Sequence, residues 1–360
     1  MRGLLLIGKI KKVKVELILT TKIDSLHAFR YDVKRWNKGK IKFTNRMMGM
    51  KRARIIYNPT SGREIFKKHI AEVLQKLETA GYETSCHATT GEGDATSAAR
   101  VAVERRYDLV VAAGGDGTIN EVVNGLAEQE YRPKLGIIPT GTTNDFARAL
   151  QIPREVEAAV DIIVKGDTIP VDIGRINEKY FINIAGGGRI TELTYEVPSK
   201  LKTVLGQLAY YLKGIEMLPS IRSTELRVEY DGKLFEGEAM LFLISLTNSV
   251  GGFEKLAPDS SINDGLFSLL ILKKTNLADF IRIATMAIRG EHVNDPSVIY
   301  TQANRIKVQS SEKVQLNLDG EFGGFLPAEF VNLYRHLEVF VPIDQIREQD
   351  LPKDWISGNK

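Results

Sequence analysis

An aspartate lies inside a glycine-rich loop in the segment VVAAGGDGTINEVVNG, which covers residues 110–125. Gly114, Gly115 and Gly117 leave backbone N–H groups uncovered just before a helix-like segment, and such an arrangement binds anions. The carboxylate of Asp116 makes chemical sense beside bound phosphates if Mg²⁺ or an ordered water lies between them. A tight structural turn is the alternative interpretation of this loop when it is taken alone.

Two common phosphate-binding motifs are excluded. The chain contains no G-x-x-x-x-G-K-[ST] sequence, and Asn120 stands where a dinucleotide-binding loop beginning at Gly115 would need its third glycine. The five histidines show no zinc spacing with Cys86, and no G-x-S-x-G sequence occurs. The glycine loop is therefore the main chemical signal in the first half of the chain.

Three further acids could complete such a site. Asp145 and Asp172, like Asp116, each follow a strand-like segment, and the ends of neighbouring parallel strands gather at one crevice. We interpret Asp116, Asp145 and Asp172 as the groups that hold Mg²⁺ and its waters. The alternatives are a helix N-cap for Asp145 and a surface acid for Asp172. Glu321 follows a turn at Asp319-Gly320 and is the candidate general base, with an exposed hairpin carboxylate as the alternative.

Alternating strand-like and helix-like segments in the first half predict a parallel sheet with helices on both faces. The apolar runs DLVVAA and LGIIP have the composition of buried parallel strands. Thr118 is expected to cap the helix after the glycine loop. The predicted strands are 54–57, 83–89, 108–113 and 135–139, and the predicted helices are 65–80, 94–105 and 118–127.

After about residue 170 the pattern changes to short strands separated by turns, which predicts a β-rich, sandwich-like domain. Asp231-Gly232 lies between two alternating segments and signals a hairpin. Helices are predicted at 201–217 and 277–289. The predicted architecture is thus an α/β N-terminal domain and a β-rich C-terminal domain with the active site in the cleft between them. The expected boundaries are 50–170 and 171–341, with the end of the second domain returning to the first, and a polar tail at 342–360.

The positive charge is concentrated at the start of the chain. Residues 1–49 hold 13 basic and 3 acidic residues, whereas the remainder holds 36 basic and 42 acidic residues. A mildly acidic body argues against a nucleic-acid-binding protein. We interpret 1–49 as a basic leader or as translation from an early start codon, and a membrane-surface segment is the alternative.

Three ordered motifs resemble the catalytic domain of the diacylglycerol kinase family, above all its soluble bacterial members. They are NPTSG at 58–62, GGDGTINEVVNG at 114–125 and PTGTTNDFARAL at 139–150. VDIG, YFINIAGGG, LTNS, PDSSINDGLF and LNLDGE also look like landmarks of this family, and the resemblance runs from about Lys51 to about Val341. NAD kinases share the glycine loop but lack the pair PTGTTNDFARAL and LNLDGE.

The resemblance implies ATP as the phosphate donor, Glu321 as the proton acceptor and Asp116 as its catalytic partner. It also implies a structural Mg²⁺ held by Asp264 with carbonyl oxygens near Ser261 and Leu266, for which a plain hairpin turn is the alternative. The residues expected around ATP are Asn58, Pro59, Thr60, Ser61, Gly62, Thr89, Gly115, Asp116, Gly117, Thr118, Ile119, Asn120, Glu121, Thr142, Asp145 and Asp172.

Diacylglycerol resides in the bilayer, so we expect a cytoplasmic protein that is peripheral to the inner face of the membrane. A basic rim of Arg63, Lys67, Lys68 and Lys213 is predicted to face anionic headgroups, with solvated surface charge as the alternative. A homodimer is expected from relatives. The predicted activity is phosphorylation of 1,2-diacylglycerol to phosphatidic acid. The alternatives are a kinase for another lipid alcohol, such as a sphingoid base or undecaprenol, and a non-catalytic nucleotide-binding membrane adaptor.

Overall fold

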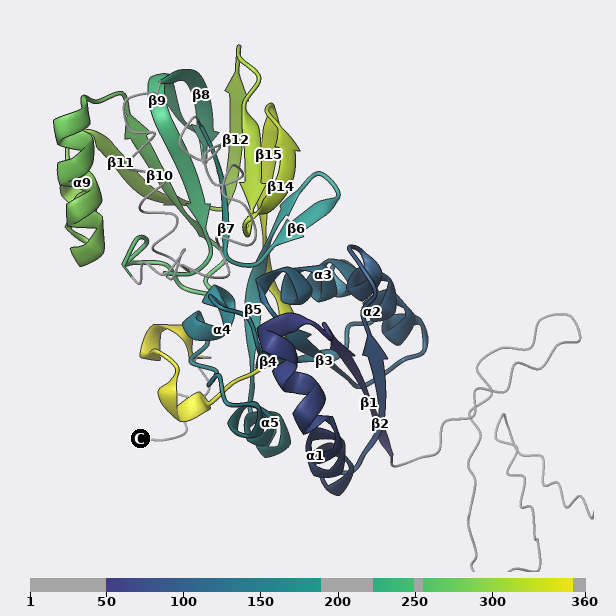
Figure 1. Ribbon diagram of the computed structural model, residues 1–360. Coiled ribbons are helices and arrows are strands. Elements are labelled where there is room, and N and C mark those ends of the chain that lie inside the picture. The colour runs from purple at the N-terminus through teal and green to yellow at the C-terminus, as the bar shows by residue number, and fades with distance from the viewer. Residues whose placement is uncertain (1–49, 189–222, 249–254, 352–360) are drawn as a thin grey trace, which may run out of the picture. The chain divides into compact units, whose positions relative to one another are not determined.

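The computed structural model describes residues 50–188, 223–248 and 255–351. The expected leader at 1–49 and the predicted helix at 201–217 lie outside these residues. Within them, the strands form one hydrogen-bonded network of 15 members that runs from an α/β part into a β-rich part, as Figure 1 shows. The predicted fold class, an α/β domain followed by a β-rich domain, is confirmed.

The α/β part is built on four strands in the order β4-β3-β1-β2. β3 pairs in parallel with β1 on one side and with β4 on the other. All six residues of β3 are buried, which explains why the sequence shows an uninterrupted apolar run there. The strands are β1 (Lys51–Tyr57), β2 (Tyr82–Ala88), β3 (Leu109–Gly114) and β4 (Lys134–Pro139).

Helices cover both faces of this sheet, as predicted. α1 (Ile65–Thr79) packs against α5 (Val156–Lys165), and α2 (Asp94–Glu104) packs against α3 (Asp116–Leu126) on the opposite face (Figure 1). Gly125 allows the close approach of α2 and α3, because a Cβ atom there would lie 2.5 Å from the carbonyl oxygen of Thr96. The short helix α4 (Asp145–Ala149) follows β4.

The start of α3 corrects one prediction. The helix begins at Asp116 and its N-cap is Gly115, so Thr118 lies inside the first turn and does not cap it. The side chain of Thr118 is buried against Gly114, where an added Cβ would lie 2.5 Å from the threonine Cβ. The glycines therefore turn the chain and also leave room for the helix to begin two residues early.

The β-rich part is an antiparallel array in the order β14-β13-β7-β9-β8-β12, with β10 pairing with β9 and β11. The predicted Asp231-Gly232 hairpin joins β8 and β9, and a second Asp-Gly turn joins β13 and β14. Both aspartates adopt positive φ. The strands are β7 (Ile184–Gly187), β8 (Thr224–Tyr230), β9 (Lys233–Ser245), β10 (Phe267–Lys273), β11 (Val298–Ala303), β12 (Arg305–Ser310), β13 (Gln315–Leu318) and β14 (Glu321–Phe325).

The predicted helix at 277–289 is present as α9 (Leu277–Arg289). Its Ile283 packs against Leu270, Leu272 and Val298 of β10 and β11, and Figure 1 shows the helix beside these strands. The described residues also contain short 3₁₀ helices, which are η1 (Ser61–Glu64), η4 (Glu291–Asn294), η5 (Ile343–Gln345) and η6 (Glu348–Asp350).

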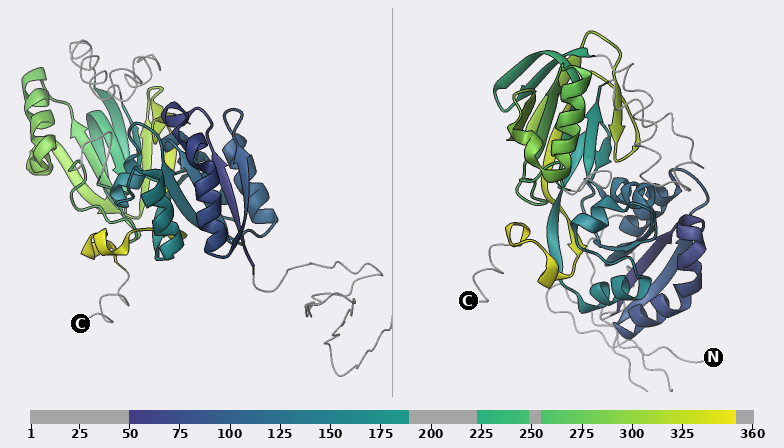
Figure 2. Two further views of the ribbon diagram at one scale, coloured as in Figure 1. Left: turned by 60° about the horizontal axis from the view of Figure 1, so that its bottom comes forward. Right: turned by 60° about the vertical axis from the view of Figure 1, so that its left-hand side comes forward.

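Two long strands belong to both parts of the network. β5 (Thr168–Ile176) pairs antiparallel with β15 (Ala328–Phe340) over most of its length. β15 also pairs with β12 near its start and in parallel with β4 near its end, where Val339 lies opposite Leu135. Figure 2 shows the yellow end of the chain beside the teal helices of the α/β part. The short strand β6 (Lys179–Phe181) returns along β5. The end of the chain is thus hydrogen-bonded to its first sheet.

An aromatic cluster fills the core where β5 and β6 meet the β-rich part. The Phe181 ring stacks on Phe267 at a centroid distance of 5.7 Å and meets Phe330 edge-on at 6.3 Å. The Phe181 ring also covers Gly174 across the β5–β6 ladder, because a Cβ at that glycine would lie 2.2 Å from the ring. A glycine is therefore required at this strand position for a packing reason.

We expect Gly174→Ala to lower the free energy of unfolding by about 1–3 kcal/mol, because the fully buried Phe181 ring has no free space to move into. Urea denaturation would measure the loss. Gly91→Ala is the matched control, since a Cβ there meets nothing within 4 Å. Equal stabilities of the two variants would contradict the packing argument.

Candidate active site

The loops that follow the four parallel strands meet at one edge of the sheet. The N–H of Asn58 donates to the carbonyl of Ala113 at 3.0 Å, and the N–H of Thr140 donates to Gly114 at 2.9 Å. The N–H of Thr89 donates to Tyr57 at 2.9 Å. The predicted nucleotide residues in 58–62, 89, 115–118 and 142 therefore belong to loops that meet at this edge, the usual ligand position in such sheets.

Glycines allow these loops to touch backbone to backbone. A Cβ at Gly62 would lie 2.2 Å from the carbonyl oxygen of Thr140, and the φ of Gly62 is +57°. A Cβ at Gly141 would lie 2.6 Å from the Cα of Gly115. Side chains are therefore excluded where the loops cross, and the backbone N–H groups there lie close to any ligand at this edge.

The NPTSG loop is ordered by its own asparagine. The Asn58 carboxamide oxygen accepts the N–H and the hydroxyl of Thr60, both at 2.9 Å. Thr140 Oγ1 and Ser61 Oγ lie 3.0 Å apart, which joins this loop to the one after β4. Pro59 lies within the turn. The loop thus has a defined shape before any ligand binds.

Asp116 is the first residue of α3 and is held between two loops. Its carboxylate accepts the N–H groups of Asn144 at 2.8 Å and Asp145 at 2.9 Å. Burial raises the pKa of Asp116, the negative charge of Asp145 raises it further, and the two N–H groups lower it. Two neighbouring carboxylates in a partly buried site favour a nearby cation, and their oxygen donors are those that Mg²⁺ prefers.

Glu321 of the β-rich part lies near the glycine loop of the α/β part. A Cβ added at Gly117 would be 3.8 Å from Glu321 Oε1, so the carboxylate lies close to the first turn of α3. Glu321 itself is exposed and is the first residue of β14. The structure therefore brings together Asp116 and Glu321, the two residues predicted as catalytic, at the start of one helix.

Asp319, two residues before Glu321, fixes this approach. Its carboxylate accepts the backbone N–H groups of Ile182, Asn183 and Ile184 at 2.8, 3.0 and 2.8 Å. It also accepts the side-chain amide of Asn120, on the second turn of α3, at 2.8 Å. The turn that carries Glu321 is thereby bonded directly to the helix that begins with Asp116.

Comparisons with known proteins place this geometry in a family. The chain is 72% identical over 302 residues to a diacylglycerol kinase of Bacillus subtilis (strain 168), covering 84% of this chain and 100% of that protein. The chain belongs to the diacylglycerol kinase family. Residues 52–176 match the diacylglycerol kinase catalytic domain, and residues 192–341 match the YegS C-terminal NAD kinase beta sandwich-like domain.

Further relatives agree. A diacylglycerol kinase of Staphylococcus aureus (strain JH9) is 55% identical over 309 residues, covering 86% of this chain and 98% of that protein. A crystal structure of a diacylglycerol kinase from Bacillus anthracis strain Sterne matches with a TM-score of 0.69 and 28% identity, covering 81% of this chain and 97% of that one. The family predicted from the sequence motifs is confirmed.

Three of the residues expected around the nucleotide of a diacylglycerol kinase have structural contacts of their own. Ile119 is fully buried in the core, so only its backbone faces the loop. Asn120 donates to Asp319 and to the carbonyl of Tyr180. The Glu121 carboxylate accepts the N–H of Ala95 at the start of α2. The side chains of these three residues have contacts within the fold, and their place beside the nucleotide stays a prediction.

Asp172 has different surroundings from the other two predicted magnesium acids. Its carboxylate accepts the N–H groups of Gly265 and Arg335, both at 2.6 Å. Burial raises its pKa to about 6, and the charge of Asp264 adds to this effect. The carboxylate of Asp116 accepts the N–H of Asp145, whereas the carboxylate of Asp172 contacts the 261–266 loop and β15.

The loop predicted to hold a structural cation is tied down by hydrogen bonds. Ser261 Oγ donates to Asp350 at 2.8 Å, and the N–H of Leu266 donates to Asp264 at 2.9 Å. Burial raises the pKa of Asp264, and the nearby charge of Asp350 also raises it. The loop therefore gathers acids, as a cation site requires, but an Asx turn accounts for the Asp264 to Leu266 bond.

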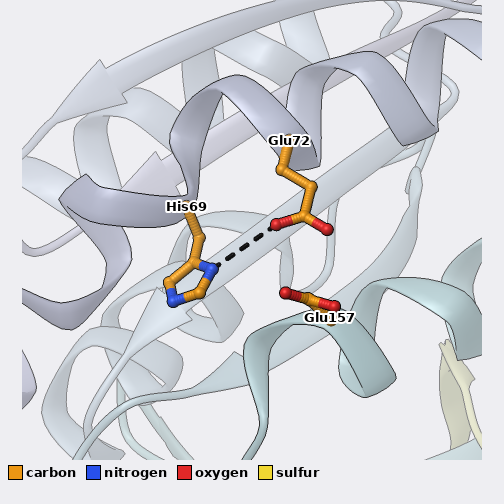
Figure 3. A group of neighbouring side chains, drawn as sticks. All are labelled: His69, Glu72 and Glu157. Carbon is orange, nitrogen blue, oxygen red and sulfur yellow. Dashed lines mark ion pairs between the residues drawn. The ribbon is translucent and has the colours of Figure 1, made fainter.

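One compact group of metal-ligating side chains occurs elsewhere in the described residues. Figure 3 shows His69 and Glu72 on α1 facing Glu157 on α5, with ligand atoms within 4.8 Å of one another. His69 Nδ1 lies 3.6 Å from Glu72 Oε2. These side chains are partly or fully exposed, and an ordinary surface ion pair accounts for the arrangement.

The basic rim is described only in part. Arg63, Lys67 and Lys68 are exposed next to the NPTSG loop, and Lys67 pairs with Glu64 at 3.0 Å. Lys213 lies outside the described residues. Among residues 50–188, 223–248 and 255–351, no helix has both the length and the apolar character needed to cross a bilayer.

We expect Asp319→Ala to lower the free energy of unfolding by at least about 3 kcal/mol more than Asp231→Ala, because four donors lose their acceptor. Asp231 is the matched control: it occupies an equivalent turn with positive φ, but its two acceptor bonds are exposed. Urea unfolding would measure both variants, and equal losses would show that the four-donor contact does not secure the turn.

The pH dependence of the same residue has a definite sign. Burial, opposed by the four donors, raises the pKa of Asp319 from 3.8 to about 6. The native state therefore binds this proton more tightly than the unfolded chain, and the stabilisation is lost as pH rises from about 4 through about 6. We expect the stability difference between wild type and Asp319→Ala to shrink by about 3 kcal/mol over this window. A difference that grew with pH would contradict the assignment.

Proposed function

We propose that the protein transfers the γ-phosphate of ATP to the free hydroxyl of 1,2-diacylglycerol, giving phosphatidic acid and ADP. The observation that carries this proposal is the position of Glu321 beside Gly117, which brings a carboxylate of the lipid-binding part to the phosphate-binding part. The names of relatives at 72% and 55% identity support diacylglycerol as the acceptor.

The strand-end loops would bind ATP. The N–H groups of Asp116 to Thr118 precede the first intrahelical hydrogen bond of α3, from Ile119 to Gly115, and would attract the phosphates through the positive end of the helix. The hydroxyls of Ser61 and Thr142 and the turn at Asn58 border the same edge and are available to the nucleotide. Glycines at the loop crossings let the phosphates approach the backbone without meeting a side chain.

Asp116 and Asp145 would hold Mg²⁺ directly or through water. The ion, when bound, supplies positive charge that neutralises the phosphate oxygens during transfer. Each Asp116 oxygen accepts one backbone N–H and therefore keeps acceptor capacity for a water or a cation. The two N–H groups also fix the direction in which that capacity points.

Glu321 would act as the general base. Its carboxylate accepts the proton of the substrate hydroxyl while the hydroxyl oxygen forms a bond to the γ-phosphorus and ADP departs. The hydrogen bonds of Asp319 hold the turn that carries Glu321. The Glu321 carboxylate is therefore already in position before the reaction, and no ordering cost is added when the substrate reacts. The rim of Arg63, Lys67 and Lys68, with Lys213 as predicted from the sequence, would keep the protein peripheral to the membrane.

Phosphate transfer from labelled ATP in mixed micelles tests the substrate. Diacylglycerol, ceramide, sphingosine, undecaprenol and NAD would be compared side by side, with and without Mg²⁺. We expect product only from diacylglycerol and only with Mg²⁺. Product from another lipid alcohol, or ATP binding with no product, would replace the proposal with one of the two alternatives set out from the sequence.

We expect Glu321→Gln to fold normally and to lose about 10²- to 10⁴-fold in kcat, because the amide cannot accept the hydroxyl proton. The affinity for ATP should stay unchanged. Glu104→Gln, at an exposed position on α2, is the control and should retain full activity. Turnover of Glu321→Gln within about threefold of wild type would remove Glu321 from the base role.

A further inference from the structure

Two exposed phenylalanines lie on the strand that begins with Glu321. The exposed fractions of Phe322 and Phe325 are 46% and 41%, and no other phenylalanine among the described residues is so exposed. β14 also lies at one end of the strand order, next to β13. Large aromatic side chains are costly to leave in water, so such a pair beside a reactive carboxylate indicates a binding surface.

A β-bulge places both rings on one face. Asn317 pairs with Phe322 and Leu316 pairs with Gly324, which leaves Gly323 as an extra residue between them. Without the extra residue, positions 322 and 325 would point to opposite faces of the strand. The two ring centroids instead lie 5.3 Å apart with an interplanar angle of 69°. Gly323 itself must lack a side chain, because a Cβ there would lie 2.6 Å from Leu318.

Two lysines flank the pair. Lys179 Nζ lies 5.6 Å from the Phe322 ring centroid and donates to the Phe322 carbonyl at 2.9 Å. Lys313 Nζ lies 4.1 Å from the Phe325 ring centroid. Aromatic rings with lysine ammonium groups beside them are typical of proteins that contact the headgroup region of a bilayer.

We propose that the surface formed by Phe322, Phe325, Lys179 and Lys313, here called the aromatic edge, docks on the lipid bilayer that contains the substrate. This inference rests on the proposed function, because the diacylglycerol hydroxyl lies at the bilayer surface and must reach Glu321. The aromatic edge begins one residue after Glu321. Insertion of the two rings at the headgroup level would therefore bring the base to the depth of the hydroxyl.

A second copy of the chain is the competing occupant of an edge strand. The bulge and the positive φ of Gly324, +103°, interrupt the regular row of backbone groups that strand pairing needs. Lysines at both ends of the aromatic edge oppose pairing with an identical edge. The described features therefore favour a fluid, anionic or zwitterionic lipid surface over a second strand.

Vesicle co-sedimentation tests the docking directly. Three full-length proteins would be compared: wild type, Phe322→Ala/Phe325→Ala and the control Leu234→Ala. Each would be mixed with phosphatidylcholine vesicles that contain about 20–30% phosphatidylglycerol. Leu234 is a matched control because it is exposed to 49% on the β8–β9 hairpin. We expect the double variant to bind about tenfold more weakly and the control to bind normally. Undiminished binding of the double variant would overturn the proposal.

Kinase assays separate docking from the proposed function. A short-chain diacylglycerol kept monomeric in solution needs no docking, whereas a long-chain diacylglycerol must be met in the vesicle. We expect the double variant to lose activity about tenfold on vesicles and to stay within about twofold of wild type on the monomeric substrate. If wild type phosphorylated neither substrate, the proposed function would fail while the binding result would still decide the docking.

A third measurement guards against an indirect effect. Phe322→Trp in a Trp36→Phe/Trp355→Phe background carries a single tryptophan. We expect its fluorescence to be quenched by vesicles with brominated acyl chains, and the fluorescence of Leu234→Trp in the same background to be unaffected. Equal quenching at both positions, or a vesicle-independent dimer in analytical ultracentrifugation that the Phe322→Ala/Phe325→Ala change abolishes, would assign the surface to another occupant.

Discussion

The arrangement of the site depends on one half-buried carboxylate with four donors. Asp319 accepts three consecutive backbone N–H groups after β6 and the side-chain amide of Asn120. A buried negative charge is tolerated only where donors surround it, so each of these segments must hold its place for the charge to be stable. The turn before Glu321 therefore takes its position from α3 and from the β6–β7 connection together.

The same principle appears at half-buried Asp116 and at buried Asp172. Asp116 is satisfied by the N–H groups that begin α4, and Asp172 by N–H groups from the 265 loop and from β15. In each case the carboxylate is bonded to backbone that is distant in sequence: Asp116 lies at the end of a strand loop, whereas Asp172 lies in the middle of β5. These acids thus tie separate segments of the chain together, and the chemistry proposed for Asp116 depends on the same contacts that order its loop.

Much of the architecture could be predicted because it is written in local patterns. The buried strand β3 is a continuous apolar run, and both Asp-Gly pairs form two-residue hairpin turns as their backbone preferences require. The family motifs also identified the loops at the strand ends. The contacts of Asp319 could not be predicted, since they join residues 135 to 199 positions apart that no local pattern connects. A polar Asn120 in the helix after the glycine loop was the available signal.

Two further details, the start of α3 and the bulge at Gly323, could not be predicted from the sequence for similar reasons. The start of α3 at Asp116 depends on the fit of Thr118 against Gly114, which is a matter of packing rather than of capping preference. The bulge at Gly323 depends on Leu318 filling the space that a side chain would need. Neither the extra residue nor the shared face of the two phenylalanines can be read from EFGGF alone, because alternation in a regular strand would separate them.

The position of β15 has a consequence for synthesis of the chain. β4 ends at Pro139 and pairs with β3 on one side. Its neighbour on the other side is β15, and this pairing forms only when Val339 reaches Leu135. A nascent chain emerging from the ribosome therefore carries β4 with an unpaired edge while roughly 200 further residues are made, at a rate of about 5–20 residues per second. The two family models match separate ranges, 52–176 and 192–341, yet the first region cannot complete its sheet until translation of the second has nearly finished.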